Sequence, residues 1–281
     1  MALKTPVVDR VPTYPGRVKL TPVSGQTNVY DMVRSDSPTE VGTPINKALF
    51  DQKAYTLTDD VTVYVSTSGS DATGTGEAVA PFRTVQKAID ELPKCLGGYH
   101  AQIDVADGTY EERVTIDSFY GGRLTLGVSG RSVTLRGITV TSSDSVRINI
   151  PLVKYSASYA GNLVHADYGS NVSIMTDMII HGESNPVSGL TAARGSVISS
   201  GVTVEIRGCQ SPAVYASSGA KIALGAINGT SGNTSYAIRA DMGGTVSFSS
   251  QGLTAALGNS TGSGGRILSG SGTTMASASI E

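Results

Sequence analysis

Acidic side chains are the first groups in this sequence that could do chemistry, because glycoside hydrolysis uses two carboxylates about 5–9.5 Å apart. Within the repeats of the chain the acids are few: Asp144, Asp167, Asp177, Glu183, Glu205 and Asp241. Asp167 and Asp241 occupy equivalent repeat positions, three repeats apart. If each repeat is one layer of parallel strands, with layers about 4.8 Å apart, these carboxylates lie roughly 14 Å apart. The sequence therefore predicts no catalytic residue of this kind.

A polysaccharide lyase would instead use calcium-binding carboxylates with an arginine or lysine base. Arg194, Arg207 and Arg239 lie within the repeats, but no group of acids accompanies them at one turn. The three histidines have no paired aspartate or cysteine at metal-ligand spacing. No G-x-S-x-G motif stands in the strand–turn–helix context that its nucleophile needs. We therefore predict neither a metal site nor a cofactor.

Tyrosines make binding easier to support than catalysis. The chain has no Trp and 4 Phe but 12 Tyr, and Tyr155, Tyr159 and Tyr168 cluster in an irregular stretch that interrupts the repeat. Sugar sites favour aromatic faces with polar groups around them, and loops that leave a regular wall often carry function. His165 and Arg239 fall in one column of the repeat. These five residues are the predicted binding residues.

The composition indicates the elements that must position these side chains. Charged residues make up 16% of the 281 residues, below the roughly 25% of ordinary domains, and Gly is abundant at 34. Many short strands joined by tight turns suit this composition, because glycine allows positive φ at turns. Long helices do not suit it, since glycine and β-branched residues destabilise them. We predict an all-β chain.

Charge and hydropathy exclude two classes of partner. The net charge is −2, with 21 basic and 23 acidic residues scattered singly, so we expect no nucleic-acid binding. No apolar run approaches the ~20 residues of a membrane helix, so we expect no membrane insertion. The segment 1–10 is polar and broken by Pro6, unlike a secretory signal. We expect synthesis in a cytoplasm, with release by a route such as lysis.

An internal repeat is the strongest signal in the sequence. Five segments align without gaps: VHADYGSNVSI from Val164, LTAARGSVISS from Leu190, VYASSGAKIAL from Val214, IRADMGGTVSF from Ile238 and ILSGSGTTMAS from Ile267. Their shared glycines are Gly169, Gly195, Gly219, Gly243 and Gly272, at intervals of 26, 24, 24 and 29 residues by subtraction. A period in the twenties predicts the stacked coils of a β-solenoid, about eight to ten of them in this chain.

The start of the repeat region resembles the opening of pectate-lyase-like β-helices. The resemblance covers VYVSTSGSDATGTGEAVAPFRTVQKAIDEL, from Val63 to Leu92, and AQIDVADGTYEERVTI, from Ala101 to Ile116. It implies a right-handed parallel β-helix over residues 55–281. Apolar residues at helical spacing from Pro81 to Leu92 predict one short helix, with Thr84 as its cap, that covers the first coil.

An N-terminal arm, residues 1–54, holds six of the 11 prolines and shows no sustained periodicity. Its segment GRVKLTPVSGQTNVYDMVRSDSPTEVGTPINKALFD resembles the N-terminal segment of tail proteins in phages and prophages of Gram-positive, Clostridia-like bacteria. The resemblance implies virion attachment through the residues of its motif: Tyr30, Asp31, Met32, Arg34, Pro44 and Asn46. A disordered tail is the alternative interpretation of this segment.

The two resemblances together imply a phage tail or baseplate protein, located in the virion. We expect an extended arm that joins other tail proteins and a β-helix that assembles as a homotrimer, matching the three-fold symmetry of a tail. We expect the β-helix to bind host cell-surface polysaccharide without cleaving it. Two alternatives stay open at this point: a polysaccharide depolymerase (lyase or hydrolase) on the same fold, and a structural head-fibre or decoration protein.

Overall fold

The computed structural model describes residues 11–12, 18–25, 27–34, 38–40, 56–159, 161–229, 232–233, 235–253 and 259–269. The chain forms two compact units, one that includes Ala2–Ala54 and one that includes Tyr55–Glu281. No helix among the described residues has the length and apolar character needed to cross a membrane.

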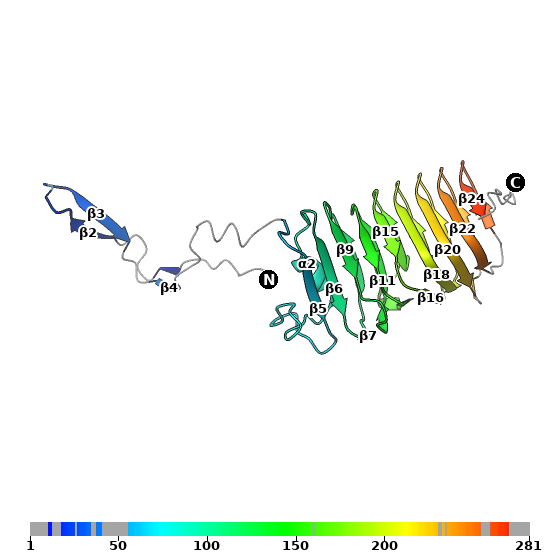
Figure 1. The fold of residues 1–281 in the computed structure, drawn as a ribbon, viewed down its shortest axis with the longest axis horizontal. Coiled ribbons are helices and arrows are strands. Elements are labelled where there is room, and N and C mark those ends of the chain that lie inside the picture. The colour runs from blue at the N-terminus through cyan, green and yellow to red at the C-terminus, as the bar shows by residue number, and fades with distance from the viewer. Residues whose placement is uncertain are drawn as a thin grey trace. The chain divides into compact units, whose positions relative to one another are not determined.

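The larger unit is a parallel β-solenoid of about seven turns, which confirms the predicted fold class (Figure 1). Successive turns place their strands in three ladders, which we call A, B and C. Strands within each ladder pair in parallel, as the A-ladder pair Val146↔Val172 and the C-ladder pair Val164↔Leu190 illustrate.

The A ladder contains β5 (Val61–Val65), β6 (His100–Val105), β9 (Arg123–Leu126), β12 (Val146–Ile148), β15 (Asn171–Ile174), the first parts of β18 (Val197–Cys209), β20 (Lys221–Gly229) and β22 (Thr245–Leu253), and β24 (Arg266–Ser269). The B ladder contains β7 (Gly108–Thr109), β10 (Val133–Leu135), β13 (Leu152–Lys154), β16 (Met178–Asn185) and the second parts of β18, β20 and β22. The C ladder contains β8 (Arg113–Asp117), β11 (Gly137–Thr141), β14 (Val164–Asp167), β17 (Leu190–Ala192), β19 (Val214–Ala216), β21 (Ile238–Ala240) and β23 (Asn259–Thr261).

Alternation along each strand builds the core. In the C ladder one inward column consists of Val164, Leu190, Val214 and Ile238, all of which are buried. Because side chains alternate between faces, the residues one position later point outward from the same strands. Burying each such aliphatic side chain contributes about 1.5–3 kcal/mol. Continuous apolar columns thus stabilise the stack of coils. The outward side chains are not needed for this core and can contact a ligand.

The turns that connect the C ladder to the A ladder contain residues in the left-handed backbone region, with positive φ. The repeat glycines Gly169, Gly195, Gly219 and Gly243 all lie in these turns, with φ between 72° and 75°. The predicted fifth segment, from Ile267, is wrong in register: Ile267 pairs with Val246, whereas Ile238 pairs with Asn259. Gly264 (φ 79°) occupies the fifth turn, and Gly272 lies outside the described residues. The last coil advances by only 21 residues, from Gly243 to Gly264, which is shorter than the intervals of 24 to 29 residues that the repeat predicts.

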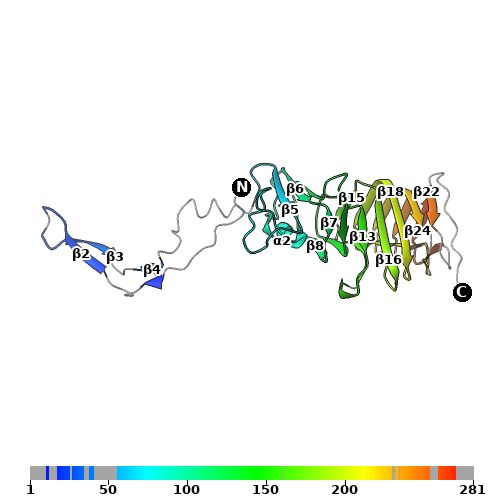
Figure 2. The same ribbon diagram turned by 90° about the horizontal axis from the view of Figure 1, so that it is seen from below.

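The described residues contain one α-helix, α2 (Val85–Glu91), capped by the Thr84 hydroxyl as the sequence predicts. It packs against β5, β6 and β8 (Figure 2). The Glu112 carboxylate accepts hydrogen bonds from the free Val85 and Gln86 N–H groups at its start. Between β5 and β6 the chain forms this helix and its loops, without B- and C-ladder strands. That excursion is one reason why the solenoid has about seven turns and fewer than the sequence period suggested.

The smaller unit pairs with itself, which the sequence analysis did not predict. Strand β1 (Val11–Pro12) pairs antiparallel with β4 (Pro38–Glu40), and β2 (Val18–Pro22) pairs antiparallel with β3 (Tyr30–Arg34). Cross-strand partners such as Leu20 and Met32 share one face of the β2–β3 ribbon. The side chains of Leu20, Tyr30 and Met32 are all more than half exposed. The β2–β3 ribbon thus exposes apolar side chains, and a two-stranded ribbon by itself is only marginally stable in water.

Candidate functional site

A shallow groove of about 340 Å³ runs along the outward face of the C ladder. Its floor comes from alternate strand residues, and its rims come from the segments before and after each strand. The lining residues are Asn162, His165, Ser188, Thr191, Ala193, Ser211, Pro212, Tyr215, Ser217 and Arg239. We call this feature the C groove.

One outward column of the C ladder forms the floor of the C groove. Strand pairing aligns His165 with Thr191, Thr191 with Tyr215, and Tyr215 with Arg239. The repeat predicted this column, but it also placed Leu268 there, which is wrong. Ser260 is the residue that pairs with Arg239. The floor therefore changes from imidazole and hydroxyl groups at one end to an aromatic ring and a guanidinium at the other.

An Arg–Asp–Tyr cluster stands at the β14 end of the C groove. Asp167 is buried, with 5% of its side chain exposed, and Arg194 donates to both of its oxygens. The Arg194 guanidinium lies 4.0 Å from the centre of the Tyr168 ring. Despite burial, the hydrogen bonds from Arg194 and from the Tyr168 N–H hold the pKa of the Asp167 carboxyl below its ordinary value. Asp167 is thus an anion that holds Arg194 in place. Because its pKa is lowered, the Asp167 carboxylate has little tendency to act as a general acid.

A second cluster of the same composition stands at the β21 end. The Arg239 Nε atom donates to Asp241 at 2.7 Å, and the Tyr215 hydroxyl donates to the same carboxylate at 3.3 Å. The Arg239 guanidinium lies 5.8 Å from the ring centres of both Tyr215 and Tyr236, within cation–π range. The two aspartates are three coils apart, about 14 Å at the usual strand spacing. Each carboxylate is occupied by an arginine, and their separation exceeds the distance that hydrolase pairs need.

Two buried polar atoms on the floor lack hydrogen-bond partners among the described residues: His165 Nδ1 and Thr191 Oγ1. His165 Nε2 lies 3.4 Å from an Asp167 oxygen. Burial lowers the pKa of His165, so the ring is neutral near pH 7. With the single proton on Nε2, facing Asp167, Nδ1 is a hydrogen-bond acceptor. Unpaired buried polar groups are costly, and a ligand or water that reached them would lower that cost.

The structure brings together only some of the predicted binding residues. His165 and Arg239 line the C groove, and Tyr168 stands beside it, 56% exposed and stacked on Arg194. Tyr155 follows β13 and is not among the lining residues, while its N–H donates to the His181 carbonyl. Tyr159 ends a 3-10 helix, η1 (Ala157–Tyr159), and its side chain lies outside the described part of the chain.

Five residues of the floor and its two clusters were not among the predicted binding residues: Thr191, Tyr215, Asp167, Asp241 and Arg194. The repeat alignment did carry a signal for them. It placed Thr191 and Tyr215 in the His165 column, and it placed Tyr168 and Arg194 at equivalent positions of adjacent coils. Side chains at equivalent positions of adjacent coils are neighbours, so the repeat places Arg194 next to Tyr168, and the structure adds that the guanidinium stacks on the ring.

The predicted virion-attachment residues all fall within the residue range of the small unit. Tyr30 and Met32 lie on β3 with 52% and 71% of their surface exposed, and Asp31 lies between them. Arg34 ends β3, but its side chain lies outside the described residues, as do Pro44 and Asn46 altogether.

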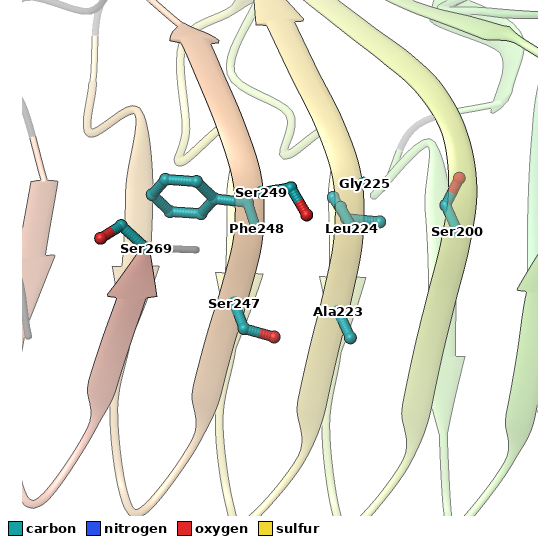
Figure 3. A pocket seen from close by; sticks show the side chains of 8 residues that line it. All are labelled: Ser200, Ala223, Leu224, Gly225, Ser247, Phe248, Ser249 and Ser269. Atoms are coloured by element: carbon teal, nitrogen blue, oxygen red, sulfur yellow. The ribbon is translucent and has the colours of Figure 1, made fainter. Parts of the chain in front are cut away.

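A second hollow, of about 360 Å³, lies on the last coils at the bend between the A and B ladders (Figure 3). Strand pairing puts Ser200, Leu224 and Phe248 in one inward column, where Ser200 stands in place of the larger residues. The remaining lining residues are Ala223, Gly225, Ser247, Ser249 and Ser269. This lining offers hydroxyl and apolar groups without a charged side chain, so it has less chemistry to offer than the C groove.

The acidic stretch DVADGTYEER has structural partners for its carboxylates. Asp107 accepts from the Ser132 N–H at 2.8 Å, Glu111 pairs with Arg136, and Asp104 lies 3.5 Å from Arg131. Glu112 caps α2, and burial raises its pKa. Among the described residues, no three His, Cys, Asp or Glu side chains gather as a metal site would require.

The C groove is thus an elongated site whose floor column carries two unpaired polar atoms, an aromatic ring and a guanidinium, with the Arg194–Tyr168 stack beside it. Such a site can bind an extended polar ligand by stacking and hydrogen bonding. Comparison with known proteins adds no relative: no protein-family model, curated protein or solved structure matches this chain.

Proposed function

We propose that this chain is a phage tail or baseplate protein whose β-solenoid binds host-surface polysaccharide through the C groove. The observation that carries the binding proposal is the pair of Arg–Asp–Tyr clusters joined by the His165–Arg239 column. Aromatic faces with fixed polar groups are what sugars need, because a sugar presents C–H surfaces and hydroxyls together. The arm motif around Tyr30–Met32 supports the virion role by its resemblance to phage tail proteins.

Binding without cleavage is favoured by the state of the two carboxylates beside the C groove. Asp167 and Asp241 are each engaged by an arginine, and three coils separate them. A depolymerase would need a second carboxylate near one of them, and assembly across subunits is the remaining way to supply one. A structural head-fibre or decoration protein would have no affinity for host glycans.

Tyr215 gives the direct test of the C groove. Replacing it (Tyr215→Ala) removes a ring from the floor and should weaken retention of the purified protein on host polysaccharide about two- to tenfold, since an aromatic contact is worth about 0.5–1.5 kcal/mol. The matched control is Tyr120→Ala, which removes an exposed ring from the first coil and should leave retention unchanged. Equal retention by both variants would remove the C groove from the proposal.

Assembly as a homotrimer belongs to the same proposal, because the arm is expected to join a three-fold structure. Light scattering of the full chain should give three times its 28.9 kDa mass. A monomeric mass at micromolar concentration would contradict this part of the proposal and leave the glycan site untouched.

A further inference from the structure

The guanidinium of Arg239 has donors to spare at one end of the C groove. Its Nε atom serves Asp241 at 2.7 Å, while its two terminal nitrogens donate no hydrogen bond within the described part of the chain. Its side chain is 43% exposed and lines the groove. A planar pair of N–H donors matches a carboxylate or phosphate oxygen pair better than it matches a neutral hydroxyl. This end of the groove therefore suits an oxyanion.

The His165 end of the C groove suits a hydrogen-bond donor instead of an oxyanion. His165 Nδ1 is an unpaired acceptor and Thr191 Oγ1 is an unpaired hydroxyl, both buried in the floor. An acceptor of this kind pairs with a hydroxyl donor and repels an oxyanion. Strand pairing places His165 three coils from Arg239, about 14 Å along the solenoid axis. One ligand that satisfies both ends must therefore be extended, with hydroxyls at one end and an oxyanion at the other.

The charge around the C groove also leaves a positive excess. Three arginines (Arg113, Arg194 and Arg239) face two carboxylates (Asp167 and Asp241), while His165 is neutral. Arg113 has no carboxylate partner among the described residues; it donates to the Thr139 hydroxyl and to the carbonyl of Asn162, which lines the groove. Its buried Nη1 atom has no partner there. A partly buried, uncompensated cation favours a nearby anion.

We propose that the C groove selects an acidic oligosaccharide that lies along the solenoid axis, with its oxyanion at Arg239 and a sugar hydroxyl at His165 and Thr191. This inference rests on the proposed glycan binding and adds the chemical class of the glycan. A uronate carboxylate and a backbone phosphodiester present the same oxygen chemistry to Arg239, so the ligand class is an oxyanion-bearing glycan from either source.

The test uses the purified full chain and immobilised glycans in matched pairs. Trigalacturonate is compared with its neutral methyl ester, and a glycerol-phosphate oligomer is compared with uncharged glycerol-linked sugar of the same length. The variant is Arg239→Gln, and the matched control is Arg266→Gln, an exposed arginine at the start of β24. Loss of one charge-assisted contact should weaken binding to the acidic members about tenfold, while Arg266→Gln should bind as the unmodified chain does.

Tighter binding of trigalacturonate than of its methyl ester, or of the glycerol-phosphate oligomer than of its uncharged counterpart, supports the inference. The pair that shows this difference identifies the source of the oxyanion. Equal binding of acidic and neutral members, or an Arg239→Gln variant that keeps full affinity for the acidic ones, overturns it while the glycan-binding proposal stands. Binding to none of these glycans, together with no retention on host polysaccharide, contradicts the proposed function itself. Thermal unfolding of both variants checks that the solenoid is intact.

Discussion

Side chains beside the C groove are held in position by residues one coil away. Asp167 on one coil is held by Arg194 on the next, and Tyr168 stacks on that same arginine. Isolated surface ion pairs contribute little, but this carboxylate is buried and receives both N–H groups of the guanidinium fork. The pair therefore fixes the arginine and the ring in place before any ligand binds.

His165 should make the stability of the solenoid depend on pH. Burial lowers its pKa below the ordinary value of about 6.5, so the unfolded chain takes up a proton that the folded chain refuses. Stability therefore falls as the pH decreases through about 6.5. The variant His165→Gln should show a smaller loss of unfolding free energy between about pH 7.5 and about pH 5.5, measured by urea titration.

Part of the slope should remain in that variant, because burial also lowers the pKa of His100. A double variant, His165→Gln with His100→Gln, should reduce the slope further. If the His165→Gln variant kept the full slope of the unmodified chain, the folded-state neutrality of His165 would be wrong.

Turns are the elements that fix the geometry of the coils. In five successive turns after C-ladder strands, a non-glycine residue with positive φ is followed by a glycine with positive φ. An ideal Cβ built on Gly169, Gly195, Gly219 or Gly243 meets no atom within 4 Å. Glycine is therefore needed at these positions because it readily adopts positive φ, and an added Cβ would meet no steric clash there.

This separation of causes gives a prediction with an internal control. Gly195→Ala (φ 75°) should destabilise the solenoid by about 1 kcal/mol, the cost of a left-handed alanine. Gly201→Ala, in β18, has an ordinary φ and open space around its Cβ, and it should be neutral or slightly stabilising. Urea unfolding measures both. Similar losses for the two alanine variants would mean that the positive φ is not the reason for glycine at these positions, since a Cβ has open space at both.

The same turns explain how much of the site could be predicted. Gly169, Gly195, Gly219 and Gly243 set the register of four coils, and that register gives the His165–Arg239 column. The last coil was missed because its 21 residues break the period. The β2–β3 ribbon was missed because its strands are joined by a seven-residue connection, Val23–Val29, without a two-residue turn signal. Which polar atoms stay unpaired depends on side-chain directions that spacing alone does not give.

In the whole molecule we expect the two units to have separate roles, glycan binding by the solenoid and virion attachment by the small unit. The solenoid has its own continuous core, while the small unit exposes Leu20, Tyr30 and Met32 on a two-stranded ribbon. A chain without residues 1–54 should keep the thermal unfolding and glycan retention of the full protein and should fail to join the virion. Incorporation of the truncated chain into particles would show that the arm is not the attachment segment.

Glycan binding without cleavage can be tested in one assay that follows two quantities. These are the retention of the purified chain on host cell-wall and capsular polysaccharide and the length of that glycan afterwards. We predict retention with the glycan intact, because the C groove carries sugar-binding groups and the carboxylates beside it are occupied by arginines. Shortened glycan would contradict it and point to a carboxylate pair completed between subunits. No retention on a confirmed host would contradict it in favour of a purely structural virion part.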